Sequence, residues 1–592
     1  MLSRVGRRLH WVGVVGVVFA ISVGAALAHE PVTSSTKFAA PMSEPAPSSS
    51  GVSLVGALRL LPTGSRGVVG DLSALGNLVA VGSAGGINVD GCGRGVSLVD
   101  IANPAAPAFI AATPGYDSTR LEDVQLHAVG GRTVLFVGAQ RCGLASGRRG
   151  LIMFDVTDPH APVESGFFPV GARGVHELDV ALTPSGRWVA LLAVPNSERQ
   201  GGVGDIWIVD VSSPAAPVLL GDYGVRGDPG LGPAFVKRAA RGEYAASYGH
   251  SARFDGTRTR AYISYWDAGA IILDLTDPAH PVRIGATTYR ATDEGNAHSV
   301  AEVDGGKIMI EADEDAWPIS GAIDVLGGRR RTHRAVDHGF GWFAALVPRP
   351  RVVKTTYVGD ACRGKVVPPL TSPSPDEWAV ASLGGCTTLR KTRLVEQAGY
   401  RGLLVMPPGG SADTVAVWDI ETEKGSSSAI GITRRAGLDV LGTPRLRGLK
   451  PGTAGRRIRV RPVFTGWGAL RIFDISDPAS PRQLSRVTTP ASRNARQAAL
   501  DVNAEFAWRS AHNPEVLGAR LYASWYREGV RVIDIANPAA PVEVGHWSGA
   551  GRPADAPFVN VWSVIPHNGL LLVSDLDFGL YVLRDDGAPP PA

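Results

Sequence analysis

The segment DLTDPAHP, residues 274–281, is one of six copies of a phrase that decides the fold of this chain. Each copy runs Asp, an aliphatic residue, any residue, a turn-forming residue, Pro, two mostly small residues and a second Pro. The other copies begin at Asp100, Asp155, Asp210, Asp474 and Asp534. Consecutive copies lie 55, 55, 64, 200 and 60 residues apart. This period predicts an array of similar units, and the long fourth gap predicts one normal unit plus roughly 140 inserted residues.

Each unit is predicted to contain four short antiparallel strands. In the copy that spans 248–283, the strands are HSARF from His250, AYISY at 261–265, AIILDL at 270–275 and a last strand that opens with PVRIG. The Asp-Pro step ends the third strand, because the Asp side chain caps the backbone and Pro has no N–H to donate. Four strands cannot bury both faces alone, so we expect the units to pack radially as an all-β, seven-bladed β-propeller.

The two ends of the repeat array predict how the ring closes. The seventh unit ends at Leu583 without the phrase and therefore lacks its fourth strand. Residues 53–60 (SLVGALRL) precede the first unit and are predicted to form one spare strand. We expect this strand to complete the last unit, because that pairing removes an exposed sheet edge.

The phrase and the strand before it, as in SLVDI, WIVDV and RVIDI, resemble the LVIVD repeat family of exported propeller proteins. The resemblance extends over about two-thirds of the chain, counted by repeats. It implies the fold and little about activity, since the family has no generally assigned chemistry.

The insertion, residues 317–465, is expected to interrupt the fifth unit between KIMIEADED (307–315) and GALRIFDI (468–475). The propeller would then consist of residues 51–316 and 466–583. Within the insertion, a strand WAVASL, a Gly-Gly-Cys turn, a helix from Leu389 to Ala398 and a strand RGLLVM follow one another. This order resembles a protease-associated (PA) domain, an α/β fold, over about 355–465, with residues 429–441 as its last strands. The resemblance implies a noncatalytic domain that binds or covers a neighbouring site.

The chain ends predict export. Residues 1–28 have a basic start, an apolar run and a small-residue cleavage site, as a signal peptide does. Residues 29–50 are predicted to be a flexible linker rich in Pro, Ser and Ala, and 584–592 a disordered tail. We expect a secreted or cell-envelope protein, extracellular or periplasmic, with membrane attachment only if the signal stays uncleaved.

Composition adds two expectations. The net charge of +4 over 592 residues is too small to indicate a nucleic-acid partner. The chain has four cysteines, and in an exported protein they favour disulfides. Cys92 and Cys142 stand at the same place in consecutive units, and Cys362 and Cys386 both fall in the insertion, so we expect these two pairs. Other pairings, and free buried thiols, remain alternatives.

Four histidines stand at the start of the first strand of their units: His176, His250, His298 and His512. First strands line the channel of a propeller, so these side chains are predicted to surround one channel mouth. Converging neutral imidazoles suit a transition metal such as zinc, copper or iron. The alternative is that a repeated histidine simply packs against the backbone of the next unit.

Carboxylates accompany these histidines in the sequence. Glu177 and Asp179 follow the first one, an acidic run extends from Glu311 to Asp315, and Asp575 and Asp577 hold the matching place in the seventh unit. In a metal-dependent enzyme, Glu311 or Asp313 could act as the base. The acidic run also fits a calcium site or a solvated turn.

The sequence favours a binding protein that presents the channel mouth and the PA-like domain to a protein, peptide or glycan. Motifs for a serine nucleophile elbow, a HExxH zinc site and a phosphate loop are absent from the sequence. The first alternative is a metal-dependent hydrolase, lyase or oxidase that uses the channel histidines, as some propeller enzymes do. The second is a structural cell-surface protein.

Overall fold

The computed structural model describes residues 46–588, with gaps at 85–91, 143–146, 172–173, 229, 232–247, 290–294, 304, 316–317, 328–330, 337–346, 365–366, 414, 417–428 and 502–507. The expected signal peptide, most of the expected linker and the end of the expected tail lie outside the described residues. Within the described part of the chain, no helix is both long and apolar enough to cross a bilayer.

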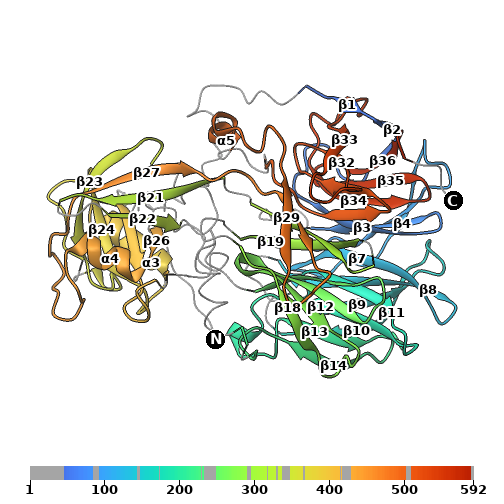
Figure 1. Ribbon diagram of the computed structural model, residues 1–592, viewed down its shortest axis with the longest axis horizontal. Helices are drawn as coiled ribbons and strands as arrows, with labels where there is room; N and C mark the ends of the chain where they lie inside the picture. The colour runs from blue at the N-terminus through green and yellow to red at the C-terminus, as the bar shows by residue number, and fades with distance from the viewer. Residues whose placement is uncertain are drawn as a thin grey trace, which may run out of the picture.

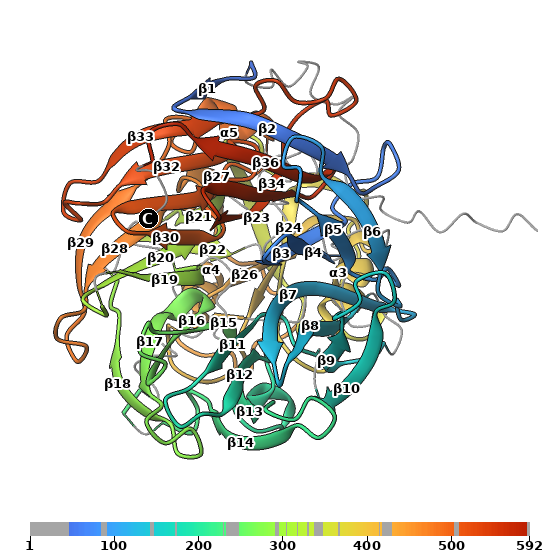
Figure 2. The same ribbon diagram turned by 90° about the vertical axis from the view of Figure 1, so that its right-hand side faces the viewer.

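Small antiparallel sheets stand around a common centre, as blades do in a β-propeller (Figure 2). One four-stranded unit consists of β11 (Leu178–Leu182), β12 (Trp188–Ala193), β13 (Ile206–Asp210) and β14 (Val218–Tyr223). The next consists of β15 (Gly249–Phe254), β16 (Arg260–Tyr265), β17 (Gly269–Asp274) and β18 (Val282–Ala286). A third consists of β19 (Ala297–Val303), β20 (Ile308–Asp313), β28 (Leu470–Asp474) and β29 (Arg482–Val487).

The first two units of the array are joined into one sheet by a single residue pair, Ser83 with Leu121. Their strands are β3 (Val69–Leu75), β4 (Leu78–Ser83), β5 (Ser97–Asp100) and β6 (Ala108–Ala112), then β7 (Thr119–Val129), β8 (Arg132–Arg141), β9 (Gly150–Asp155) and β10 (Val163–Pro169). The sixth unit consists of β30 (Pro514–Leu517), β31 (Arg520–Ser524), β32 (Val530–Asp534) and β33 (Val542–Trp547), with β1 (Ser49–Ser50) added at its edge.

The last unit is completed by the start of the chain. Its own strands are β34 (Val561–His567), β35 (Leu570–Asp575) and β36 (Gly579–Asp585), and β2 (Val52–Arg59) pairs antiparallel with β36 from Val52–Asp585 to Arg59–Gly579. The spare strand expected at 53–60 therefore takes the place of the missing fourth strand. Apolar side chains such as Leu191 and Ile263 form the cores between neighbouring sheets.

The repeated phrase forms the turn between the third and fourth strands. The Asp274 carboxylate accepts a hydrogen bond from the backbone N–H of Thr276 at 2.8 Å, and Asp277 accepts one from Ala279 at 3.0 Å. The equivalent first contact recurs in the other five copies, at Asp100, Asp155, Asp210, Asp474 and Asp534. The carboxylate thus satisfies a backbone donor where the strand ends, which explains why Asp opens every copy.

A glycine in the fourth strand of one unit packs against the phrase of the next unit. A Cβ added at Gly166 would lie 1.7 Å from the carbonyl oxygen of Pro214, and one at Gly285 would lie 1.6 Å from that of Pro478. Gly56 on the closing strand has the same contact with Pro104, at 2.2 Å. The closing strand therefore joins the last unit to the first in the same way as the other neighbours are joined.

Both expected disulfides are present. Cys92 pairs with Cys142 and Cys362 pairs with Cys386, with Cα atoms 5.8 and 5.5 Å apart. The first bond links the turns that follow the second strands of the first two units.

The insertion forms a closed barrel that lies over one face of the ring (Figures 1 and 2). The order of its strands is β21-β22-β26-β25-β24-β23-β27. The bounds are β21 (Ile319–Val325), β22 (Arg331–Val336), β23 (Arg351–Tyr357), β24 (Ser374–Ser382), β25 (Tyr400–Met406), β26 (Ala429–Ile432) and β27 (Ile458–Phe464). β21 and β27 pair with each other, and Thr465 N donates to Pro318 O at 2.8 Å, so a two-stranded neck leads into the barrel.

Of the two helices described in the insertion, one matches the sequence expectation to within a residue and the other was not expected. The helix expected at 389–398 is α3 (Thr388–Gln397), capped by the Thr387 side chain. Residues 429–441, expected to be strands only, form β26 and then α4 (Arg434–Leu441), where Thr433 caps the helix and Ala436 and Val440 face the core. A third helix, α5 (Ala495–Asp501), lies in the propeller part of the chain.

We predict that Gly285→Ala destabilises the ring. The added methyl group would meet the Pro478 carbonyl, so the two units must separate, at a cost of about 1–3 kcal/mol in the free energy of unfolding. Urea denaturation checks this value. Gly171→Ala is the control, because nothing lies within 4 Å of its added Cβ. Equal stabilities of the two variants would contradict the inter-unit contact.

We also predict a pH-dependent effect of Asp274→Ala. Hydrogen bonds from the Thr276 side chain and backbone lower the pKa of Asp274, so its contribution is present above the unfolded pKa of about 4 and is lost as pH falls below it. The variant should lose about 0.5–1 kcal/mol at pH 7 and less at pH 3. Denaturation of both proteins at the two pH values measures the difference. A loss that grows toward pH 3 would contradict it.

Candidate metal centre

Equivalent residues stand near the start of the first strands of the units, and we name them the mouth residues. They are Gly70, Glu122, His176, His250, His298, His512 and Trp562. His250 and His298 stand at register shifts of their strands, as do Glu122 and Trp562. A β-bulge of this kind redirects one side chain out of the regular alternation. The register shifts therefore let four of these strands present an additional side chain at that place.

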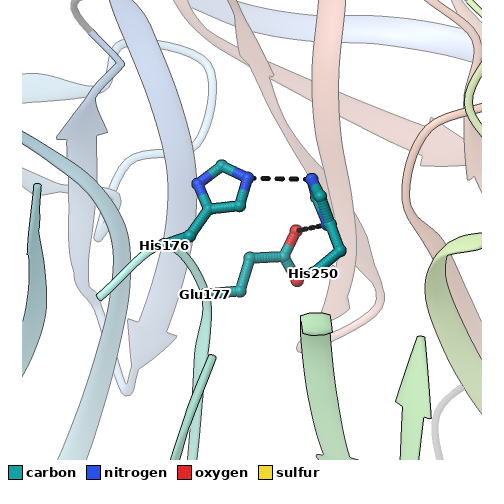
Figure 3. A group of neighbouring side chains, drawn as sticks. All are labelled: His176, Glu177 and His250. Carbon is teal, nitrogen blue, oxygen red and sulfur yellow. Dashed lines mark hydrogen bonds and ion pairs between the residues drawn. The ribbon is translucent and has the colours of Figure 1, made fainter. Parts of the chain in front are cut away.

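The four predicted histidines form a row along neighbouring units, which we call the histidine row (His176, His250, His298 and His512). Successive ring centroids lie 4.3, 4.2 and 4.1 Å apart. The Nε2 atoms of His176 and His250 face each other at 2.8 Å, with Glu177 beside them (Figure 3). The structure thus brings together all four histidines that the sequence singled out.

The outer ring nitrogens are held by the neighbouring unit. His250 Nδ1 lies 3.1 Å from the carbonyl oxygen of His298, and His512 Nδ1 lies 2.7 Å from that of Trp562. A carbonyl oxygen only accepts, so Nδ1 carries the hydrogen in both rings. The lone pair then lies on Nε2, which points inward. In metal-binding histidines, too, a hydrogen bond from one ring nitrogen to a carbonyl or carboxylate oxygen orients the ring and leaves the other nitrogen free to bind.

Three carboxylates reach the row. Glu177 Oε1 lies 3.6 Å from His250 Nδ1 and 3.8 Å from His298 Nε2. Glu314 lies 3.7 Å from His298 Nε2 and 4.0 Å from His512 Nε2. Glu122 lies 3.6 Å from His176 Nδ1 and is also paired with Arg120. A carboxylate oxygen therefore lies between 3.6 and 4.0 Å from a ring nitrogen of every histidine in the row.

Four polar atoms at the row are buried without a hydrogen-bond partner among the described residues: Glu122 Oε2, His176 Nδ1, Glu177 Oε2 and His512 Nε2. Glu177 is 4% exposed and His512 is 1% exposed. A buried polar atom without a partner costs roughly 1–3 kcal/mol, so the fold gains nothing from these atoms by themselves. Their placement favours a group that is bound at the row.

Burial also sets the charge of these groups. It lowers the pKa of His250 and His298 well below the usual value, and it lowers the pKa of His512 to about 3. These three imidazoles are therefore neutral at physiological pH, which is the form that binds metals. Burial raises the pKa of Glu314 to about 7, despite the hydrogen bond that it accepts from the Tyr526 hydroxyl.

Further carboxylates lie deeper in the channel around Arg253. Burial alone would lower the pKa of Arg253, but the charges of Asp123, Glu177, Asp179 and Glu515 raise it. Asp123 accepts a hydrogen bond from the N–H of Leu178 at 2.6 Å. Burial raises the pKa of Asp123 and of Glu177 well above the usual carboxyl value, and the Arg253 charge opposes this shift in both.

Aromatic side chains enclose the row. The Trp266 ring lies 4.7 Å from that of His250, and Tyr526 and Trp562 lie 5.1 and 4.1 Å from His512. Tyr526 has a φ of +40°, an unfavourable backbone conformation for a large residue, and its hydroxyl donates to Glu314. Trp266 therefore borders the histidine row.

The two carboxylates proposed as the base lie in another cluster. Asp313 Oδ2 pairs with Arg471 Nε at 2.6 Å, and Glu311 lies 4.0 Å from the same nitrogen and accepts from the Tyr289 hydroxyl. No described contact joins either one to the histidine row; Glu314, just beyond the strand, makes that contact instead. The Asp575 carboxylate accepts a hydrogen bond from the backbone N–H of Asn560 at 2.6 Å and so holds the loop before β34.

Sequence reasoning missed Glu122, Trp562 and Tyr526. The first two hold the same place as the histidines, in units that carry no histidine there. An alignment of all first strands, rather than a search for repeated histidines, would have found them. Tyr526 precedes a turn whose backbone conformation leaves no clear sequence signal.

A family model described as LVIVD repeat matches residues 202–225, 261–288, 463–489 and 510–548. Solved structures with similar folds include the β-propeller domain of Cps50 (Swd1) from Myceliophteria thermophila, with 10% identity, a TM-score of 0.40, and 90% of this chain and 98% of that chain covered. BamB from Moraxella catarrhalis shows 9% identity, a TM-score of 0.36 and coverages of 91% and 99%. Sqt1 from Chaetomium thermophilum, solved with the N-terminus of the ribosomal protein L10, shows 10% identity and a TM-score of 0.40, with 88% of this chain and 98% of that chain covered. No curated protein matches the chain.

We predict that Arg253→Met lowers stability by about 3 kcal/mol, because the variant leaves several buried carboxylates without their cation. Arg482→Met is the matched control, since Arg482 pairs with Asp474 at the surface and its loss should cost less than about 1 kcal/mol. Thermal and urea denaturation compare the two. Similar losses in both variants would show that Arg253 does not hold the channel together.

Proposed function

We propose that this LVIVD-repeat propeller binds a transition metal at its histidine row and uses it to activate water for hydrolysis. The carrying observation is the 2.8 Å separation of His176 Nε2 and His250 Nε2. Two nitrogens at about 2.0–2.1 Å from one ion, at a right angle, lie about 2.9 Å apart. Glu177 supplies a carboxylate close to the same two rings (Figure 3).

The donor set indicates the class of metal. Two imidazoles and one carboxylate are found in catalytic zinc sites and in non-haem iron sites, both of which keep open positions for water or substrate. Bound zinc brings the pKa of its water to about 7. Glu314 faces the same row and is the carboxylate that we assign as the base, in place of Glu311 or Asp313.

The surrounding architecture is part of the proposal. We count seven blades, with the eight-stranded sheet taken as two, and we assign residues 317–465 to an inserted PA-like domain. The neck of that domain follows Glu314 after only a few residues, so the domain stands near the histidine row. Two disulfides and the signal-like start of the sequence support export.

A propeller built from repeats also suggests an interaction scaffold, which is the second candidate function. The observation that favours it is an exposed valine at the start of the fourth strand in four units: Val163, Val218, Val282 and Val542, each 57–61% exposed. These side chains and the PA-like domain could bind a protein, peptide or glycan. Loss of binding on changing these valines to serine, with metal retained, would support this function.

Metal content is the direct test of the first candidate. Purified mature protein should contain transition metal by mass spectrometry, and His250→Ala should lose at least nine-tenths of it, because His250 lies at the centre of the close contacts. The control is His280→Ala, whose side chain is 84% exposed and pairs only with Asp277 among the described contacts. Equal metal content in wild type, His250→Ala and His280→Ala, or no metal in any of them, would contradict the proposal.

A further inference from the structure

We infer that one outer face of the inserted barrel binds an acidic polysaccharide. The inference rests on the second candidate function, for which it names a partner class, and it needs no metal. It starts from the distribution of charge along the chain. Residues 317–465 contain 23 Lys and Arg and 11 Asp and Glu, a net charge of +12, whereas the other 443 residues contain 36 and 44, a net charge of −8. Such an asymmetry indicates that the basic part has an anionic partner.

Strand β27 presents a row of arginines on the outside of the barrel. Ile458 and Val460 point into the core, on the side where α4 also packs. Because side chains alternate along a strand, Arg459 and Arg461 point outward, and Arg457, just before the strand, continues the row. Residues two apart in a strand lie about 6.6 Å from each other. The row therefore offers positive charges at regular intervals along an extended line.

The neighbouring strands add to this row. Ala322 of β21 lies opposite Arg461 on one side and opposite Arg334 of β22 on the other. On β23, Val352 lies opposite Arg459, and Lys354 follows two residues later on the same side. Figure 1 shows β23, β27 and β21 along the upper side of the barrel, away from α3. We name these five residues the basic face: Arg334, Lys354, Arg457, Arg459 and Arg461.

Few carboxylates neutralise the basic face. Asp324 lies beneath it, 1% exposed, with its Oδ2 3.4 Å from Arg461 Nε. Glu377 lies 3.1 Å from the Lys354 ammonium. Arg457 and Arg459 are exposed, and neither forms an ion pair with a carboxylate of the described residues. Each guanidinium can donate two parallel hydrogen bonds to a carboxylate, sulfate or phosphate group.

The loop between α4 and β27 extends the same surface. It runs beside β23, because Gly455 N donates to Thr355 O and Gly452 N donates to Tyr357 O, both at 2.8 Å. Four more exposed basic residues stand on this loop: Arg445, Arg447, Lys450 and Arg456. The basic surface is therefore long enough to contact several groups of one polymer at once.

The chemistry of the barrel surface favours a polysaccharide over other anionic partners. Among the described residues of 317–465, no large apolar side chain is exposed. Protein interfaces have an apolar centre, and membrane-surface elements bury apolar side chains in the lipid boundary. Single-stranded nucleic acids stack on aromatic rings, but Tyr357, Trp378 and Tyr400 are all buried. A hydrophilic polymer with repeated acidic groups fits what remains.

Binding of purified mature protein to heparin and to polygalacturonate tests the inference, with dextran as the uncharged control. Calorimetry in 150 mM salt should show binding to at least one of the two acidic polymers and none to dextran. Heparin carries sulfates and polygalacturonate carboxylates, so the tighter of the two identifies the acidic group. Because salt screens exposed charges, raising the salt to 500 mM should weaken binding at least tenfold.

A matched pair of charge reversals locates the surface. Arg457→Glu/Arg459→Glu should weaken binding at least tenfold. Arg390→Glu/Arg393→Glu makes the same change in net charge on α3, where both residues are exposed, and should weaken it less than threefold. If the first variant fails to fold by circular dichroism, Arg457→Gln/Arg459→Gln replaces it, with an expected loss of at least threefold. Equal losses in the two variants would overturn the inference.

The remaining outcomes separate this inference from the proposed function. No binding to either acidic polymer would overturn it, as would tighter binding to phosphatidylglycerol vesicles or to single-stranded DNA than to both polymers. The metal content of both double variants should equal that of wild type. Val163→Ser/Val282→Ser should keep polysaccharide binding, so a partner lost only in that variant would support the scaffold function even where the polysaccharide assay fails.

Discussion

Contacts between a phrase and a glycine of the preceding unit recur at four places and fix how closely those neighbouring units pack. At Gly166, Gly221 and Gly285 an added Cβ would lie between 1.6 and 2.7 Å from a carbonyl of the next unit, so the strand backbone rests directly on the turn. Where the fifth unit has a larger residue, Ser485 uses its hydroxyl to donate to Pro538 O at 2.7 Å. Because similar contacts recur between units, neighbouring first strands repeat at similar intervals. The near-equal spacing of the imidazoles, 4.1–4.3 Å, follows from this regularity.

The chemistry of the mouth is confined to one arc of the ring. Units three to six supply histidines, whereas the corresponding residues of the first and last units are Gly70 and Trp562. A Cβ at Gly70 would lie 2.6 Å from the carbonyl oxygen of Glu122, so backbone occupies the space that a side chain would need there. Hydroxyls complete the arc: Ser251 and Ser299 donate to the carbonyls of the next two histidines. The histidines are thus positioned by backbone contacts between units and need no metal for their placement.

The sequence predicted the features that depend on repetition or on long segments. The turns that begin with Asp, the closing strand, both disulfides and the common position of the four histidines all follow from comparing one unit with another. The identity of the nearby carboxylate did not follow. Glu311 and Asp313 are two residues apart in β20 and therefore face the same side, toward Arg471, while Glu314 lies one residue past the end of the strand and turns to the channel. Sequence reasoning places strand ends only to within a few residues. Here that difference decides the role of a carboxylate, because Asp313 pairs with Arg471 whereas the next residue, Glu314, lies at the candidate site.

The closing strand has a consequence for how the protein reaches its native state. β2 (Val52–Arg59) can pair with β36 (Gly579–Asp585) only after almost the whole chain has been made and the inserted barrel has been passed. Contacts between such distant segments are entropically unfavourable to form and are associated with slow folding. Until that pairing occurs, the last unit keeps an open edge that can join another chain. A chain that is synthesised from its N-terminus therefore carries the strand that completes the ring long before its partner is made.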